Sequence, residues 1–223
     1  MKKLFLMAVM VAATLSANAQ REPGTLTIQP KVGAGLSNIT KFNPLDEMVQ
    51  NMTIDKKMNI AAMAGAELEY QLTPMFSAAV GLNYSIQGTA WKDIKVTGSG
   101  GYAEMKDMQM NLDYVNLPIV VNAYLFKGFA VKAGVQLGYL TSAKFKYTQD
   151  INGDEETHES SNGKDDCQKI DFSIPVGVSY EISNVVFDLR YQLGLTKIFK
   201  DTFWDKSSKN SVFMLTVGYK IDL

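Results

Sequence analysis

Strict alternation of apolar and polar residues is the dominant pattern of this chain, and it is clearest between positions 169 and 198. Every second residue from Ile170 to Ile182 is apolar, and the residues between them are polar or small. The alternation restarts after Ser183 and Asn184 and continues to Leu195. A period of two indicates a β-strand with two different faces, and two such strands across a short polar turn predict an antiparallel hairpin.

Six further segments show the same alternation, so the sequence predicts eight strands. The predicted strands are Gln29–Ile39, Ile60–Tyr70, Phe76–Gln87, Tyr114–Leu125, Phe129–Tyr139, Ile170–Ile182, Val185–Thr196 and Phe213–Leu223. Short turns alternate with four long polar loops, which are Thr40–Asn59, Gly88–Asp107, Ala143–Gln168 and Lys197–Asn210. This order predicts an all-β fold, an eight-stranded antiparallel up-and-down barrel, with the short turns at one end and the long loops at the other. Pro118 lacks a ladder donor, so we expect a bulge or a local break there.

Alternation alone also fits a secreted, lipocalin-like carrier with an apolar interior, and the aromatic residues separate the two possibilities. One group on the apolar face lies near the short turns or the chain end: Tyr70, Phe76, Phe129, Tyr180, Phe187 and Tyr219. A second group lies on the same face toward the long loops: Tyr84, Tyr139, Phe172 and Phe213. Their spacing along tilted strands gives two belts about 20 to 25 Å apart, which matches the two interfaces of a membrane. The sequence therefore predicts a transmembrane barrel with its apolar face outward.

The opposite face carries charges of both signs, with glycine and serine between them. The predicted lumen charge network consists of Lys31, Glu67, Glu69, Lys132, Asp171, Glu181, Asp188, Arg190 and Lys220. Because eight strands enclose only enough room for side chains, we expect these charges to pair and fill the lumen. The prediction is a plugged barrel and not a pore.

The first residues have the three-part layout of a secretory signal: Lys2 and Lys3, an apolar run to Leu15, and small residues up to Ala19. We predict a signal peptide over 1–19 with cleavage near Ala19, and a barrel domain over 20–223. The apolar run is too short for a membrane-spanning helix. Without Lys2 and Lys3 the chain is close to neutral, which argues against nucleic acid as a partner.

Signals for enzymatic chemistry are few, and no cofactor is predicted. Cys167 is the only cysteine, so no internal disulfide is possible. His158 is the only histidine and lies beside Ser160 and Ser161, a pairing that leaves a lipid-modifying hydrolase as an alternative. A loop histidine without an orienting group is the simpler interpretation.

Acidic residues gather in the longest predicted loop. Asp150, Asn152, Asp154 and Glu156 offer oxygen ligands for Ca²⁺, together with Glu155. The spacing departs from a helix-loop-helix calcium site, because Glu155 stands where a glycine is needed and Ser161 where a bidentate glutamate belongs. A solvated acidic loop is the default, and calcium binding is the alternative.

Three wall segments resemble recurrent segments of the PorT-like outer-membrane β-barrel family: YVNLPIVVN at 114–122, DFSIPVGVSY at 171–180 and DLRYQLGLTKI at 188–198. The resemblance implies an eight-stranded barrel in the outer membrane of a Gram-negative bacterium, inserted by the barrel-assembly machinery. One group of this family takes part in a protein secretion system. The matching segments describe the barrel wall and carry no catalytic residues.

The leading hypothesis is a non-enzymatic outer-membrane barrel with surface loops for structural or recognition roles. The expected partners are membrane lipid and the barrel-assembly machinery. We expect a monomer. The alternatives are a secretion-system component that docks other subunits, a lipid-modifying enzyme, and a secreted carrier.

Overall fold

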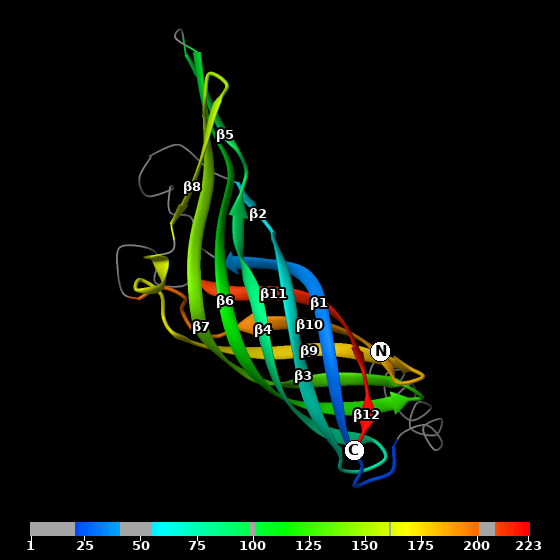
Figure 1. Cartoon of the computed structure of the whole chain (residues 1–223). Coiled ribbons are helices and arrows are strands. Elements are labelled where there is room, and N and C mark those ends of the chain that lie inside the picture. The colour runs from blue at the N-terminus through cyan, green and yellow to red at the C-terminus, as the bar shows by residue number, and fades with distance from the viewer. Residues whose placement is uncertain (1–20, 41–54, 99–100, 161, 201–207) are drawn as a thin grey trace, which may run out of the picture.

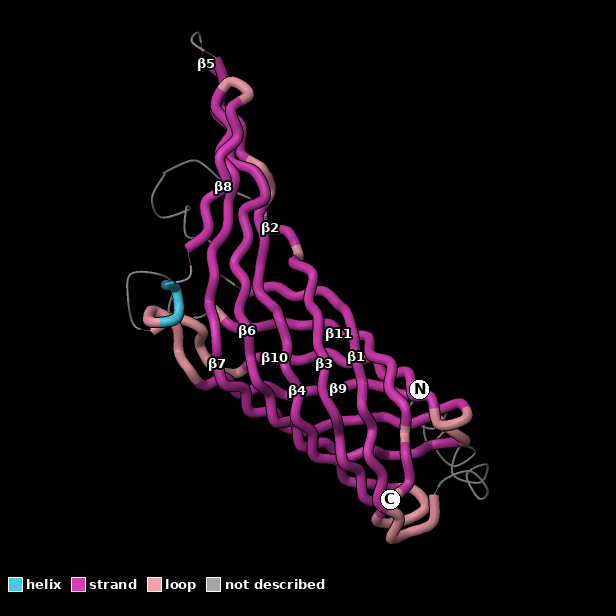
Figure 2. Tube along the Cα trace, viewed as in Figure 1, coloured by secondary structure: helices cyan, strands magenta, loops and turns pink. Residues whose placement is uncertain are grey.

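The structure is a computed structural model, and it describes residues 21–40, 55–98, 101–160, 162–200 and 208–223. The predicted signal peptide and its cleavage site lie outside the described residues. Strands make up most of the described chain, and a short 3-10 helix, η1 (Asn162–Lys164), lies beside the barrel, below the projecting strands (Figure 2). Among the described residues, no helix is long and apolar enough to cross a bilayer.

Eight strands pair into a closed antiparallel ring (Figure 1). They are β1 (Leu26–Thr40), β3 (Asn59–Gln71), β4 (Phe76–Trp91), β6 (Gly101–Phe126), β7 (Phe129–Ile151), β9 (Ile170–Ile182), β10 (Val185–Gly194) and β11 (Lys209–Tyr219). Each pairs with the next in this order, and β11 pairs with β1 to close the ring. The predicted all-β, eight-stranded up-and-down barrel is confirmed.

Both described ends of the chain lie at the short-turn end of the barrel. The last strand, β12 (Ile221–Asp222), pairs with the start of β1, where Thr27 opposes Asp222. The three short turns between β3 and β4, β6 and β7, and β9 and β10 close the same end. The ladder thus joins the two ends of the chain, and every barrel strand has two neighbours, which leaves no open edge in the wall.

The two faces of the wall have opposite chemistry. Outward apolar side chains are exposed, for example Leu82 at 60% and Val135 at 58%. Inward charged side chains are buried, for example Asp188 at 0% and Lys132 at 4%. An apolar exterior around a polar interior suits lipid, where the backbone groups are paired within the ladder and apolar side chains meet acyl chains. The secreted-carrier alternative requires the reverse arrangement, and the structure overturns it.

Two of the four predicted loops are β-structure instead. The segment Gly88–Asp107 contains the end of β4, the strand β5 (Ile94–Gly98) and the start of β6. The segment Ala143–Gln168 contains the end of β7 and the strand β8 (Asp154–Ser160). Together β5, β8, residues 101–110 of β6 and residues 145–151 of β7 form a sheet that extends beyond the barrel (Figure 1), which we call the blade.

The hairpin between β7 and β8 has a recognisable local cause. Asn152 and Gly153 both have positive φ angles, 54° and 97°, which is the backbone of a two-residue type I′ turn. Asn-Gly between strands is a strong hairpin signal, but polar and charged flanks replace the apolar alternation here, so composition favoured a loop. Cross-strand hydrogen bonding and ion pairs hold this segment as a strand.

The other two predicted loops are described only in part. In Thr40–Asn59, the strand β2 (Lys56–Lys57) pairs with β4 at Trp91 and Ala90, and residues 41–54 lie outside the description. In Lys197–Asn210, Cys167 and Phe199 form an isolated bridge, and residues 201–207 lie outside it.

Candidate functional site

Five charged side chains from four strands meet at the centre of the lumen. Arg190 donates to Glu67 at 3.0 Å and to Asp188 at 2.6 Å, and Lys132 reaches the same Asp188 oxygen at 2.7 Å. Lys31 pairs with Glu67. All five are buried. Because each ion has an opposite charge within hydrogen-bonding distance, this layer fills the lumen with paired charges.

A second cluster lies between this centre and the short-turn end. Lys220 contacts Glu69 at 2.8 Å and Glu181 at 3.3 Å. Tyr124 donates to Glu69, and its hydroxyl oxygen accepts from Lys220 at 2.8 Å. Ser77 donates to Glu69 at 2.7 Å. Lys220, Glu69, Glu181, Tyr124 and Ser77 therefore form one connected hydrogen-bond and ion-pair network.

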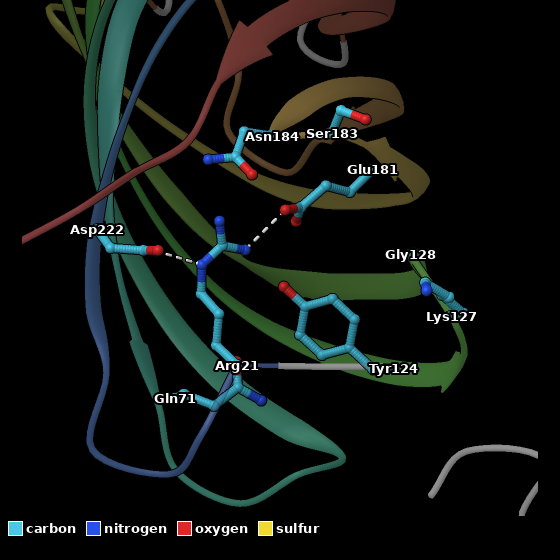
Figure 3. Close-up of a pocket in the computed structure, with 9 residues that line it drawn as sticks. All are labelled: Arg21, Gln71, Tyr124, Lys127, Gly128, Glu181, Ser183, Asn184 and Asp222. Atoms are coloured by element: carbon cyan, nitrogen blue, oxygen red, sulfur yellow. Dashed lines mark hydrogen bonds and ion pairs between the residues drawn. The ribbon is translucent and has the colours of Figure 1, made fainter. Parts of the chain in front are cut away.

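Arg21 closes the network at the short-turn end, and the sequence analysis missed it. Its guanidinium pairs with Glu181 at 2.7 Å and with Asp222, so it joins the start of the described chain to β9 and β12 (Figure 3). A cavity of about 320 Å³ opens here. Its lining comprises Arg21, Gln71, Tyr124, Lys127, Gly128, Glu181, Ser183, Asn184 and Asp222. The predicted network held five carboxylates against four cations, and this imbalance was the signal for a missing cation.

Asp171 lies inside the barrel but does not join the ion pairs. Its carboxylate accepts a hydrogen bond from Thr196 at 2.6 Å, and within the described residues it has no salt-bridge partner. The eight other residues of the predicted network all make ion pairs. Asp171 is separated because the layer between it and the ions is built from amides.

That layer consists of neutral polar side chains. Asn116 donates to Asn83 at 3.0 Å and to Ser85 at 2.9 Å. Gln136 donates to Asn116 and to Gln192, each at 3.3 Å. Above it the lumen ends in an apolar cap that the sequence analysis did not predict, composed of Ile39, Trp91, Met108, Met110, Leu112, Tyr114, Leu140, Ala143, Cys167, Ile198 and Phe199. The lumen is therefore closed by ions, amides and an apolar cap in turn.

The predicted aromatic residues all lie on the outer wall. Tyr70, Phe76, Tyr84, Tyr139, Phe172, Tyr180, Phe187, Phe213 and Tyr219 are exposed. Phe129 is half-buried because it stacks on Phe126 with ring centroids 4.6 Å apart.

Ion pairs run across the blade from one edge strand to the other. Lys106 on β6 contacts Asp150 on β7 at 2.5 Å and Glu155 on β8 at 3.0 Å. Lys95 on β5 contacts Glu104 at 3.5 Å. The hydrogen bond from Lys106 holds the pKa of the Asp150 carboxyl below its usual value, and the two carboxylates raise the pKa of Lys106.

The residues predicted as a calcium site lie on opposite faces of the blade. Asp150 opposes Glu155, whereas Glu156 opposes Gln149 and Asp154 opposes Ile151. Opposed residues share a face, so Asp150 lies on one face of the sheet and Asp154 and Glu156 lie on the other. Asn152 sits in the turn, where its side-chain oxygen accepts from the Tyr102 amide at 2.8 Å. Among the described residues, no group of three or more His, Cys, Asp or Glu is placed to hold a metal ion.

His158 is packed as a cross-strand neighbour of an aromatic ring. It stacks on Tyr147 with ring centroids 5.0 Å apart, and its Nε2 lies 3.8 Å from Glu156. Within the described residues no serine hydroxyl is hydrogen-bonded to it, and Ser161 lies outside them. Among the residues that the structure describes, His158 therefore has no activated nucleophile.

Comparison with protein families assigns this barrel to a known family. Residues 18–200 match a family model described as the outer membrane protein beta-barrel domain. The chain belongs to this family. In outer membrane barrels of the Gram-negative type, short turns face the periplasm and long connections face the exterior. The matched range ends before β11, the strand that closes the ring.

Several solved outer membrane proteins resemble this family member in chain trace. Ail of Yersinia pestis, solved in complex with the heparin analogue sucrose octasulfate, shares 14% identity over 89% of this chain and 99% of its own, with a TM-score of 0.42. Neisserial surface protein A shares 12% identity over 88% and 97%, with a TM-score of 0.42. OprG of Pseudomonas aeruginosa shares 13% identity over 92% and 100%, with a TM-score of 0.41. No curated protein matches the chain.

Proposed function

We propose that this protein is a closed, non-enzymatic outer membrane barrel whose task is to hold the blade at the cell surface as a recognition element. The proposal rests on two features found together: the lumen is filled with side chains, and the blade is a long paired sheet that extends beyond the barrel. The lumen offers no passage past its ion layer and apolar cap. What the molecule presents to the exterior is the blade and the connections beside it.

The blade has the properties of a binding surface. It is a paired sheet whose strands are linked by Lys106, so its shape is fixed before a partner arrives. Among the described elements β8 pairs only with β7, and β5 only with β6, so both strands have a free edge. A free edge can accept an extended segment of a partner by strand addition.

The absence of an enzymatic role is part of the proposal. His158 is stacked on Tyr147, and the described residues bring no nucleophile to it. We further propose that the outward aromatic residues anchor the two membrane interfaces, that the barrel-assembly machinery inserts the chain after removal of residues 1–19, and that the barrel is monomeric.

Shortening the blade tests this function. Ile94 opposes Met105, and Phe145 opposes Ser160, so an Asn-Gly turn can replace residues 95–104 and another can replace 146–159. Both cuts retain every buried residue of the apolar cap, and the second cut removes Tyr147, which packs against the cap. The shortened protein should still fold as a barrel, which the mobility difference between unheated and boiled samples on a gel reports.

Living cells that display either form are then treated with a surface cross-linker. We expect a partner to be captured by the full-length protein and lost with the shortened blade. An identical set of cross-linked partners for the two forms would contradict a recognition role for the blade.

The three wall segments that resemble PorT-like proteins support a second proposal, a component of a protein secretion system. In that case mild detergent should co-purify stable subunits with the barrel, and deletion of the gene should deplete secreted proteins from the medium. Purification of an isolated barrel together with an unchanged set of secreted proteins would reject it.

A further inference from the structure

Two ladders of the barrel lose two consecutive residue pairs without any change of register. Between β4 and β6 the pairing stops at Val80–Ile119 and resumes at Asn83–Asn116. Between β7 and β9 it stops at Ala133–Val176 and resumes at Gln136–Ser173. The wall is therefore interrupted on both sides of the β6–β7 hairpin.

A proline causes each interruption. Pro118 keeps its pairing with Gln136 on β7, so its missing N–H faces β4. Pro175 keeps its pairing with Gln192 on β10, so its missing N–H faces β7. The break expected at Pro118 is present, and Pro175 makes a second one.

The gap between β7 and β9 is the weaker of the two. Five pairs hold these strands from Phe129 to Ala133 and four from Gln136 to Tyr139. The β4–β6 ladder has eight pairs above its gap, from Asn83 to Ala90. At both gaps a glycine opposes the proline, Gly134 opposite Pro175 and Gly81 opposite Pro118, so one side of each gap has no inward side chain.

Two buried polar atoms beside this gap have no hydrogen-bond partner. They are Oε1 of Gln136 and Oγ of Ser173, on side chains about 4% exposed. Gln136 and Ser173 are directly opposed, so both atoms belong to the first pair above the gap. At the β4–β6 gap, by contrast, Asn116 donates to Asn83 and Ser85.

We propose that the β7–β9 gap is a lateral portal through which the polar head of a membrane-dissolved molecule reaches Gln136 and Ser173. Opening here disturbs a ladder that already lacks the N–H donor of Pro175, and Gly134 offers no side chain to displace. A donor that enters satisfies two acceptors that the closed wall leaves unpaired. The ligand class is therefore an amphiphile with a neutral hydrogen-bond-donating head, such as an alcohol or amide.

The height of the portal fits such a ligand. Pro175 lies three residues from Phe172, an outward aromatic toward the long-connection end, and five from Tyr180 near the short turns. At about 3.3 Å per residue along a tilted strand, the gap opens below the outer interface, where head groups meet acyl chains. The proposal stands apart from any role of the blade.

Cysteine labelling in lipid vesicles tests the portal. Cys167 is replaced by serine, and Ser173→Cys is compared with Thr216→Cys. Thr216 is a matched control because it is also inward, buried and unpartnered, while its ladders to β1 and β10 are continuous. The reagents are N-dodecylmaleimide, which partitions into lipid, and a charged, water-soluble methanethiosulfonate.

We expect N-dodecylmaleimide to label Ser173→Cys at least about tenfold faster than Thr216→Cys. Adding Pro175→Val restores the missing donor and should bring the rate down to that of the control. Equal labelling of the two cysteines, or faster labelling of Ser173→Cys by the charged reagent, would overturn the proposal, since access would then be through the aqueous ends.

Hydrogen exchange of the unaltered barrel supplies a readout that needs no variant. The backbone amide of Gly134, which faces β9 at the gap, should exchange faster than those of Leu189 and Arg190, which lie in continuous ladders. Equal protection at the two places would also reject the portal.

Discussion

Arg190 is shared by two buried carboxylates of the lumen, because it joins Glu67 on β3 to Asp188 on its own strand. Both carboxylates have a second cation, Lys31 and Lys132. Removing Arg190 therefore leaves two buried anions with one partner each. The cost of a lost buried ion partner exceeds that of a surface pair, since water cannot replace it.

Arg190→Gln is expected to lower the free energy of unfolding by about 3 to 5 kcal/mol. Urea titration of the barrel in lipid vesicles, followed by gel mobility of unheated samples, measures the change. Lys127→Gln is the control, because Lys127 makes no ion pair within the described residues and should leave the urea midpoint unchanged. A similar shift of the urea midpoint in both variants would show that the ion pairs of the lumen do not stabilise the barrel more than a surface lysine does.

Gly88 is the residue that lets β4 continue past the barrel rim. Its φ is +149°, and a Cβ would lie 1.8 Å from the carbonyl oxygen of Met110 on β6. Gly88→Ala is expected to destabilise the barrel by about 1 to 3 kcal/mol, because the backbone of β4 or β6 must move. Gly24→Ala separates the causes, since Gly24 also has a positive φ but no atom within 4 Å; an equal loss in both would exclude the clash.

At the scale of the element, the blade depends on charges that titrate. The pKa of Asp150 is lower in the folded protein than its ordinary value, because Lys106 donates a hydrogen bond to the carboxylate. The ionised form of Asp150 therefore stabilises the blade. That contribution is present above the ordinary aspartate pKa of about 4 and is lost as the pH falls through the lower folded value. Lys106 has a raised pKa, so its contribution is present at neutral pH and is lost only in strong alkali.

Acid is therefore expected to loosen the blade before it affects the barrel. Limited proteolysis with pepsin at decreasing pH should produce cuts within 101–110 or 145–160 while the barrel stays intact. In Lys106→Gln the blade should already be sensitive at neutral pH, tested with a neutral protease. A blade that resists both treatments would show that backbone pairing alone holds it.

At the scale of the whole molecule, the lumen is closed by three layers of different chemistry. Ion pairs lie in the centre, amides above them, and the apolar cap toward the exterior. An ion that crosses must break buried pairs and then enter an apolar layer, and each step is costly. Closure does not rely on a single residue.

Planar bilayers containing the inserted protein are therefore expected to show no steady channel conductance. Insertion is verified independently by protection of the barrel from added protease. Stable conductance steps that scale with protein amount would contradict a plugged lumen and would reopen a transport role.

The sequence by itself determined the eight strands of the wall, their order and the two faces of the wall. A period of two assigns each residue from Ile170 to Ile182 to one of the two faces. A register error of one residue would move the apolar side chains to the charged face. Which face points outward also followed from sequence, because only a membrane accounts for aromatic residues at two heights on the apolar side.

Only the tertiary structure decided which buried groups meet and where the strands end. Arg21, Glu181 and Asp222 are far apart in sequence, and ring closure brings them together. Asp171 has the same alternation as Asp188, yet the stagger of the strands places the Thr196 hydroxyl beside Asp171 and two cations beside Asp188. The blade escaped prediction for a related reason: its strands are held by hydrogen bonds and ion pairs between segments, and such pairing leaves no apolar period in either segment alone.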